Sequence, residues 1–211
     1  MRIHKVLSCL LVSALVIFGA SAANAQATGQ IWQNDTSGTA DVSIASLAGL
    51  PTAKFLTFTA NYNSNTTGYT PALFLNSPTF FSTANGFSAT ASLDNSHVLI
   101  IGAVLLAAGA NNFDVVHDDG VNISVGALGG VDKPGPTSQV TDSFSVTAPS
   151  AGVYPFVLNY NECCGPPAVL EWTYATGAPV TFAPEPCTIL LMGTGLVGLA
   201  AYRKYRKFKK I

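Results

Sequence analysis

Alternation of apolar and polar residues with a period of two dominates the second half of the chain and limits what it can fold into. The apolar positions are Val121, Ile123 and Val125, then Phe144 and Val146, then Tyr154, Phe156, Leu158 and Tyr160, and finally Ala168, Leu170, Trp172 and Tyr174. Because consecutive side chains of a strand point to opposite faces, each run predicts a half-buried β-strand. Turn-forming clusters such as GALGGVDKPGPTS and NECCGPP separate the runs. This spacing predicts an all-β domain, an antiparallel β-sandwich or barrel.

Two other parts of the middle of the chain are less regular. The apolar segment Val98–Gly109 fits either a buried strand pair or a short helix, and its periodicity does not separate the two. Between Ile31 and Ser92 we expect strands joined by longer polar loops.

The first 25 residues have the layout of a secretory signal peptide. Arg2 and Lys5 precede an apolar stretch, and Ala23–Ala25 supplies small residues for cleavage. We expect residues 1–25 to be removed, so that the mature chain begins at Gln26 and is exported.

Residues 183–211 combine three features in a fixed order. Pro184, Glu185 and Pro186 precede an apolar run of 16 residues from Cys187 to Tyr202, and a cluster of Arg and Lys follows. A comfortable spanning helix needs about 20 residues, so this run predicts a marginal transmembrane helix. Its basic flank is expected to stay on the cytoplasmic side.

This layout resembles the PEP-CTERM sorting signal of Gram-negative exopolysaccharide producers. The resemblance implies that Pro184, Glu185 and Pro186 are the sorting motif and that an intramembrane exosortase processes the tail. The inner-membrane form would then be an intermediate on the way to the cell surface or extracellular matrix. Cys187 stands where Ser, Thr or Ala is common in that family. The simpler alternative is a permanent single-pass membrane anchor, which needs no enzyme.

The segment between the two termini, Gln26–Phe182, has the length of one domain and a strongly acidic balance. It contains eight Asp and two Glu but only two basic residues, Lys54 and Lys133, which leaves eight net negative charges. Such a surface argues against nucleic acid or anionic lipid as a partner, and it suits cations or neutral sugars.

Asp118 and Asp119 are adjacent and lie between two alternating runs, with Gly120 after them. The simplest interpretation is a tight hairpin turn at Asp119-Gly120, joining Asn111–Val116 to Val121–Val125. A hairpin does not explain Asp118, because adjacent like charges repel unless a cation or hydrogen-bond donors offset them. Calcium binds six to eight oxygens, and paired carboxylates at a strand end supply several. The pair therefore predicts either a structural turn or a calcium site.

From Asn111 to Tyr174 the sequence resembles the C-terminal half of a PA14-type β-domain. The shared features are a strand running into Asp-Asp-Gly, a further strand, a G-x-Y strand that ends in Tyr160, a small-residue loop and a strand that carries Trp172. The resemblance does not extend to Gln26–Leu93.

In carbohydrate-binding members of that family, an Asp pair joined by a cis peptide binds calcium, the loop after the Tyr completes the site, and the metal binds sugar hydroxyls. The resemblance therefore implies a metal site made of Asp118, Asp119 and Asn161 or Glu162, with backbone carbonyls. The adhesins usually have Asn in this loop, so the neighbouring Glu162 leaves the register open by one residue.

Cys163 and Cys164 are adjacent in a segment that is expected to reach an oxidising compartment. Consecutive Cα atoms lie about 3.8 Å apart, below the usual disulfide range, so a vicinal disulfide needs a distorted, rigid loop. We favour this bond, and two free buried thiols or bonds to another chain are the alternatives.

Signals for catalysis are weak. The mature segment has only His97 and His117 as histidines, and the sequence contains no nucleophile elbow, zinc-protease motif or phosphate loop. A glycoside hydrolase that uses Asp118 and Glu162 is a distant alternative. We predict that the protein is not an enzyme.

Together these features predict an exported, exosortase-sorted cell-surface or extracellular-matrix protein of a Gram-negative bacterium. Its PA14-like β-domain is predicted to bind calcium and extracellular polysaccharide. The alternative is a structural protein of the surface or biofilm matrix, in which Asp118 and Asp119 only turn the chain.

Overall fold

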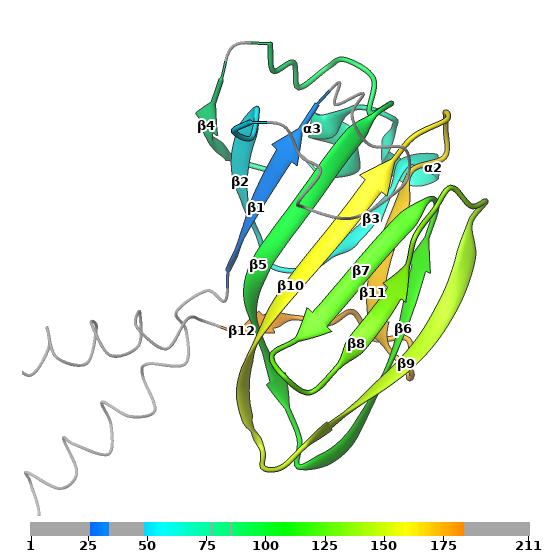
Figure 1. Ribbon diagram of the computed structural model, residues 1–211. Coiled ribbons are helices and arrows are strands. Elements are labelled where there is room, and N and C mark those ends of the chain that lie inside the picture. The colour runs from blue at the N-terminus through cyan, green and yellow to red at the C-terminus, as the bar shows by residue number, and fades with distance from the viewer. Residues whose placement is uncertain (1–25, 34–48, 77, 85, 184–211) are drawn as a thin grey trace, which may run out of the picture. The chain divides into compact units, whose positions relative to one another are not determined.

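Two antiparallel β-sheets pack face to face in the computed structural model, which describes residues 26–33, 49–76, 78–84 and 86–183 (Figure 1). The larger sheet has the order β4-β2-β1-β5-β10-β7-β8, and β12 also pairs with β5. Its strands are β1 (Ala27–Trp32), β2 (Ala53–Thr57), β4 (Phe80–Thr83), β5 (Ser96–Leu106), β7 (Gly120–Val125), β8 (Gly130–Lys133), β10 (Gly152–Glu162) and β12 (Phe182–Ala183). The smaller sheet has the order β3-β11-β6-β9. Its strands are β3 (Asn61–Asn63), β6 (Gly109–His117), β9 (Val140–Ala148) and β11 (Val169–Tyr174). The predicted all-β, antiparallel sandwich is confirmed.

The apolar positions of the alternating runs meet between the sheets. Phe156 of the larger sheet lies against Trp172 of the smaller one, with 5.2 Å between ring centroids, and Phe113 lies 5.6 Å from the same Trp172. All three side chains are almost completely buried. Since large aromatic side chains bury the most surface per residue, this cluster contributes much of the free energy that holds the two sheets together.

The segment Val98–Gly109 forms most of one long strand, so the predicted strand pair or short helix is wrong. β5 runs from Ser96 to Leu106 in the larger sheet, and most of its residues are buried whichever face they are on. Burial on both faces removes the alternation that would have marked a strand. Gly102 permits this packing, because a Cβ there would lie 2.7 Å from the Cβ of Ala27.

The described residues between Ile31 and Ser92 form the expected strands and loops, and also two single-turn helices, α2 (Ser64–Thr67) and α3 (Pro71–Phe74). Thr70 caps α3 by accepting a hydrogen bond from the amide of Leu73, and Pro71 occupies the first helical turn. The helix places Phe74 against Tyr160 of β10, with 5.8 Å between ring centroids.

Residues Gln26–Ala183 form one compact unit. The predicted signal peptide, the motif Pro184, Glu185 and Pro186, and the apolar run after it lie outside the described residues. Within the described ranges, neither helix is long and apolar enough to cross a membrane.

Candidate functional site

Asp118 and Asp119 lie where the chain crosses from one sheet to the other. β6 pairs with β9 and β11, whereas β7 pairs with β8 and β10. The hairpin predicted between these two strands is therefore wrong, because the strands belong to different sheets and Asp118-Asp119 is the link. Asp119 has a φ of 65°, in the left-handed region that Asp tolerates better than most residues.

Three carboxylates converge beside this link. One oxygen each from Asp118, Asp119 and Glu162 lies within 4.8 Å of the other two, and we call these three residues the carboxylate cluster. Glu162 is the last residue of β10, and the three residues are only 7, 2 and 0% exposed, respectively. Buried carboxylates repel one another and lose hydration, so this arrangement needs hydrogen-bond donors or a cation to offset the charge.

Asp119 has backbone donors from two loops. The amide of Cys163 donates to its Oδ2 at 2.7 Å, and the amide of Thr137 donates to its Oδ1 at 3.2 Å. The amide of Asp119 in turn donates to the carbonyl of Thr137 at 3.1 Å. The side chain therefore joins the loop after β8 to the loop after β10.

His117, the last residue of β6, also contacts the Asp118-Asp119 link. Its Nδ1 donates to the carbonyl of Asp119 at 2.7 Å, and its Nε2 lies 3.0 Å from Oδ2 of Asp142, whose other oxygen pairs with Lys133 at 2.8 Å. These contacts fix the backbone of Asp119 and leave its carboxylate directed at the two loops.

Glu162 has tyrosine hydroxyls as donors. Tyr69 donates to Oε1 at 2.7 Å and Tyr160 donates to Oε2. The hydroxyl of Tyr69 also lies 2.8 Å from Oδ1 of Asp94. These hydrogen bonds hold the buried carboxylate of Glu162 in position.

The pKa values of all three carboxyls are raised. Burial is the main cause in each case, and it raises the pKa of Glu162 to about 8. For Asp118 the neighbouring charge of Asp119 is the second cause. The hydrogen bonds from Tyr160 and Tyr69 oppose the rise at Glu162 without cancelling it. A cation placed among these groups would favour their charged forms.

An open pocket of about 400 Å³ leads to the cluster. It is lined by Asp118, Asp119, Pro136, Thr137, Ser138, Cys163, Cys164, Gly165, Pro166 and Pro167. Two of the three carboxylates therefore line the pocket, while Glu162 lies outside its lining. Cys163 and Cys164 form a vicinal disulfide in the wall of this pocket.

Asn161, the other residue that sequence analysis offered for this loop, is also buried and lies opposite Gly120 in the pairing of β10 with β7. Consecutive side chains of a strand point to opposite faces, so the side chain of Asn161 lies on the other face of β10 from Glu162. The structure brings Glu162 to Asp118 and Asp119.

In the carbohydrate-binding members of the family that the sequence resembles, a cis peptide joins the Asp pair. In the described residues the cis bonds are Gly135-Pro136 and Pro166-Pro167, in the two loops beside the pocket, and the Asp118-Asp119 bond is trans. The Asp pair of this chain differs in this respect from that of those members. The left-handed backbone at Asp119 provides the change of chain direction instead.

Sequence reasoning missed the donors that surround the cluster. Tyr69 and Thr137 come from loops far from Glu162 and Asp119 in the sequence, and neither lies in a motif that indicates a polar site. Only Tyr160, two residues before Glu162 and therefore on the same face of β10, could have been identified from strand periodicity.

No family model matches the sequence, and no curated protein matches it. Among the solved structures, 23 chains match in fold, and they include two PA14 domains. The crystal structure of the PA14 domain of the MpAFP antifreeze protein has a TM-score of 0.56 and 18% identity, covering 74% of this chain and 85% of that chain. A PA14 sugar-binding domain from an RTX adhesin has a TM-score of 0.53 and 19% identity, covering 76% of this chain and 96% of that chain.

The described domain therefore has a PA14-like fold. The similarity covers more of the chain than the segment Asn111–Tyr174, on which the resemblance rested, so the PA14-like fold includes residues before Asn111. At these identities the similarity establishes the fold alone, and the ligand must be argued from the site.

Proposed function

We propose that this protein is an exported cell-surface or extracellular-matrix protein whose PA14-like domain binds calcium at the carboxylate cluster and, through the ion, hydroxyls of a polysaccharide. The observation that carries the proposal is the convergence of Asp118, Asp119 and Glu162 to within 4.8 Å beside an open pocket. Two oxygens bound to one calcium ion at 2.3–2.6 Å can be no more than about 5 Å apart, so the spacing fits.

The charge balance around the cluster supports a cation. The two lysines of the described residues lie elsewhere, because Lys133 pairs with Asp142 and Lys54 belongs to β2. Calcium needs six to eight oxygens, and the carboxylates supply only some of them. The open pocket leaves room for water and for sugar hydroxyls to complete the coordination.

Polysaccharide is the proposed partner for two reasons. The acidic exported segment disfavours polyanions such as nucleic acid. A solved PA14 domain of similar fold is itself described as a sugar-binding domain from an RTX adhesin. The apolar disulfide and prolines beside the carboxylates also suit a sugar ring, which has both hydroxyls and an apolar face.

The direct test is calorimetric titration of calcium into the purified protein and into an Asp118→Asn, Asp119→Asn double variant. Asp132→Asn is the matched control, because Asp132 is an exposed aspartate of β8. We expect saturable binding to the wild type and the control, and none to the double variant. Absence of binding to all three proteins would refute the calcium site, and calcium-dependent glycan binding should be tested only if the ion binds.

We further propose that an exosortase sorts the protein through Pro184, Glu185 and Pro186, so that the membrane-bound form is transient. The support is the order of motif, short apolar run and basic cluster in residues 183–211. Intact-mass analysis of the protein released from cells tests it. A C-terminus close to Pro186 is expected, whereas a chain that still ends at Ile211 would favour a permanent anchor.

A purely structural surface protein is the second candidate, and the bonding of Asp119 favours it. Both carboxylate oxygens of Asp119 accept from backbone amides, so this side chain joins two loops without any ion. In that case calcium would neither bind nor stabilise the protein, and the titration above separates the two candidates.

Glycoside hydrolysis by Asp118 and Glu162 fits the structure poorly. Glu162 is 0% exposed and both of its oxygens accept from tyrosines, so a glycosidic bond has no path to it. A hydrolase needs both carboxyls at the scissile bond. Loss of polysaccharide hydrolysis in Asp118→Asn would be the result that revives this candidate.

A further inference from the structure

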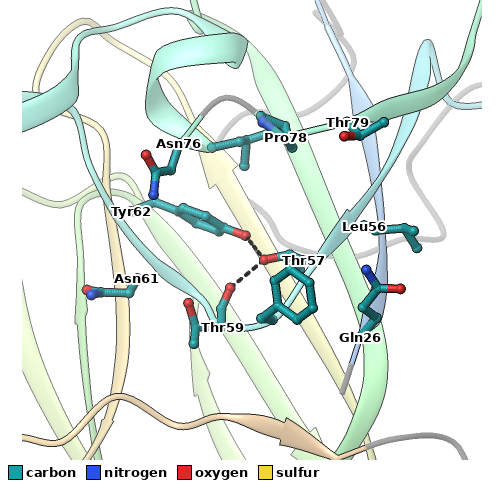
Figure 2. A pocket seen from close by; sticks show the side chains of 11 residues that line it. Gln26, Leu56, Thr57, Thr59, Asn61, Tyr62, Asn76, Pro78 and Thr79 are labelled. Atoms are coloured by element: carbon teal, nitrogen blue, oxygen red, sulfur yellow. Dashed lines mark hydrogen bonds between the residues drawn. The ribbon is translucent and has the colours of Figure 1, made fainter. Parts of the chain in front are cut away.

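A second pocket of about 400 Å³ lies in a different part of the same domain (Figure 2). It is lined by Gln26, Leu56, Thr57, Phe58, Thr59, Asn61, Tyr62, Leu75, Asn76, Pro78 and Thr79, and we call it the amide pocket. These residues come from the start of β1, the end of β2, β3 and the segment between α3 and β4. It shares no lining residue with the pocket beside the carboxylate cluster.

Two hydroxyl groups in the amide pocket already have partners. Thr57 donates its hydroxyl hydrogen to the carbonyl of Thr59 at 2.7 Å, so the hydroxyl of Tyr62 must donate to Thr57. Figure 2 shows Tyr62 reaching toward Thr57 between Asn61 and Gln26. Because Thr57 and Tyr62 are buried and bonded to each other, their positions are fixed before any ligand binds.

The polar side chains that remain for a ligand are uncharged. Gln26, Asn61 and Asn76 each carry an amide, with Asn61 and Asn76 exposed, and none of the lining side chains is an acid or a base that is charged near pH 7. An amide offers a carbonyl acceptor and two N–H donors, which is the combination that a hydroxyl group needs for both of its roles. The lining side chains therefore give an ionic ligand no counter-charge.

Phe58 adds an apolar surface to this polar rim. Its side chain is 48% exposed, whereas Phe55, three residues earlier in the same segment, is fully buried. The backbone at Phe58 is fixed, because its carbonyl accepts from the amide of Phe182 at 2.9 Å. An aromatic ring held at the edge of a pocket of amides and hydroxyls matches a sugar ring, which has an apolar C–H face and a rim of hydroxyls.

We propose that the amide pocket is a second saccharide-binding site, which takes neutral sugars and needs no calcium. Strand addition by a peptide is a poor alternative at β2, because this strand is paired on both sides, with β1 and with β4. The proposal goes beyond the calcium site, because it uses neither Asp118 nor Asp119.

The test is binding of a panel of neutral hexasaccharides, namely β-1,4-glucan, β-1,3-glucan, α-1,4-glucan and β-1,4-mannan, to the purified protein with calcium chelated by EGTA. At least one is expected to bind. Phe58→Ala should weaken that binding by about tenfold or more, in line with the loss of a central aromatic contact. Phe81→Ala is the matched control, because Phe81 is an aromatic residue that is 53% exposed and lies outside the pocket.

Asn61→Ala is the second variant, because Asn61 is exposed at the rim and its loss should weaken binding without unfolding the domain. The Asp118→Asn, Asp119→Asn variant should bind the same hexasaccharide as well as the wild type does. The proposal is overturned if no hexasaccharide binds in EGTA, or if Phe58→Ala and Asn61→Ala bind as well as Phe81→Ala does. Failure of the calcium titration would leave these outcomes unchanged, so the two sites are tested separately.

Discussion

The carboxylate cluster and the amide pocket lie in one domain, but they treat polar side chains differently. The cluster buries ionisable groups, and the amide pocket exposes neutral ones. The cluster places three ionisable side chains in positions that are 7% exposed or less, and it offsets them with donors from distant loops. The amide pocket keeps ionisable carboxyls out and exposes neutral amides and one phenyl ring.

This difference predicts that substitutions at the two sites lower the stability of the fold by different amounts. A buried charge that loses its partners, or buried donors that lose their acceptor, cost several times more free energy than an exposed contact. Variants at the carboxylate cluster should therefore alter stability as well as binding. Variants at the rim of the amide pocket should alter binding while leaving stability nearly unchanged.

The largest effect is expected for Asp119→Ala. This change leaves the amides of Cys163 and Thr137 without their acceptor and puts Ala into a left-handed backbone. Two unsatisfied donors at about 1–3 kcal/mol each, plus about 1 kcal/mol for the backbone, suggest a loss of about 3–7 kcal/mol. Chemical denaturation measures this, and Asp132→Ala on the exposed surface of β8 should change stability by less than about 0.5 kcal/mol. Equal losses in both variants would contradict the assigned role of Asp119.

Calcium should give the next largest effect. At a hundred times its dissociation constant, an ion that binds only the folded protein adds about 2.7 kcal/mol of stability. Thermal unfolding with calcium and with EGTA measures this difference. It should vanish in the Asp118→Asn, Asp119→Asn variant and persist in Phe58→Ala. A calcium effect that survives in the double variant would place the ion elsewhere.

Without calcium, stability should fall as the pH rises from 5 to 7. Glu162 has a pKa of about 8 in the folded protein and an ordinary value of 4.5, so between these values the folded protein keeps a proton that the unfolded chain has lost. The slope is at most about 1.4 kcal/mol per pH unit for one group, and a total of about 1–2 kcal/mol is expected. Asp118 and Asp119 act in the same direction. The pKa of Asp142 is lowered by its hydrogen bond with Lys133, so its contribution is lost only below about pH 4.

Denaturation midpoints in EGTA at pH 5, 6 and 7 measure this dependence. Glu162→Gln removes the titrating group and keeps an acceptor for one of the two tyrosines, so its stability should depend less on pH. Saturating calcium should also weaken the dependence in the wild type, since an ion favours the charged carboxylates. A wild type whose stability rises over this range would contradict the raised pKa of Glu162 as the main source of the pH dependence.

The strands with clear alternation could be predicted from the sequence because each has one buried and one outer face. Val121, Ile123 and Val125 are such positions, and all three are buried. β5 could not be predicted in this way, since packing on both of its faces removes the period. The crossover at Asp118-Asp119 was also mistaken for a hairpin. Local sequence indicates that the chain turns, but which strand pairs with which is decided by the whole sandwich.

Some residues of the candidate sites could likewise be predicted from the sequence, and others could not. Asp118, Asp119 and Glu162 stand out in the sequence because charged residues are scarce among the strands, and the structure brings them together. Their donors Tyr69 and Thr137 could not be found, because long-range packing positions them. The amide pocket could not be predicted either, because its residues come from separate short segments with no shared motif.

The smallest effect on stability is expected for Phe58→Ala, and it tests the other half of the comparison. Phe58 is 48% exposed, so truncation should cost less than about 1 kcal/mol, whereas Phe55→Ala, at a fully buried position that packs over Gly29, should cost about 3–5 kcal/mol. Chemical denaturation of the two variants gives both values. A small loss for Phe58→Ala together with weaker hexasaccharide binding would mean that the exposed ring serves the ligand and not the fold. A loss as large as that of Phe55→Ala would instead make Phe58 a part of the core, and the amide pocket would lose the apolar surface on which its ligand was inferred.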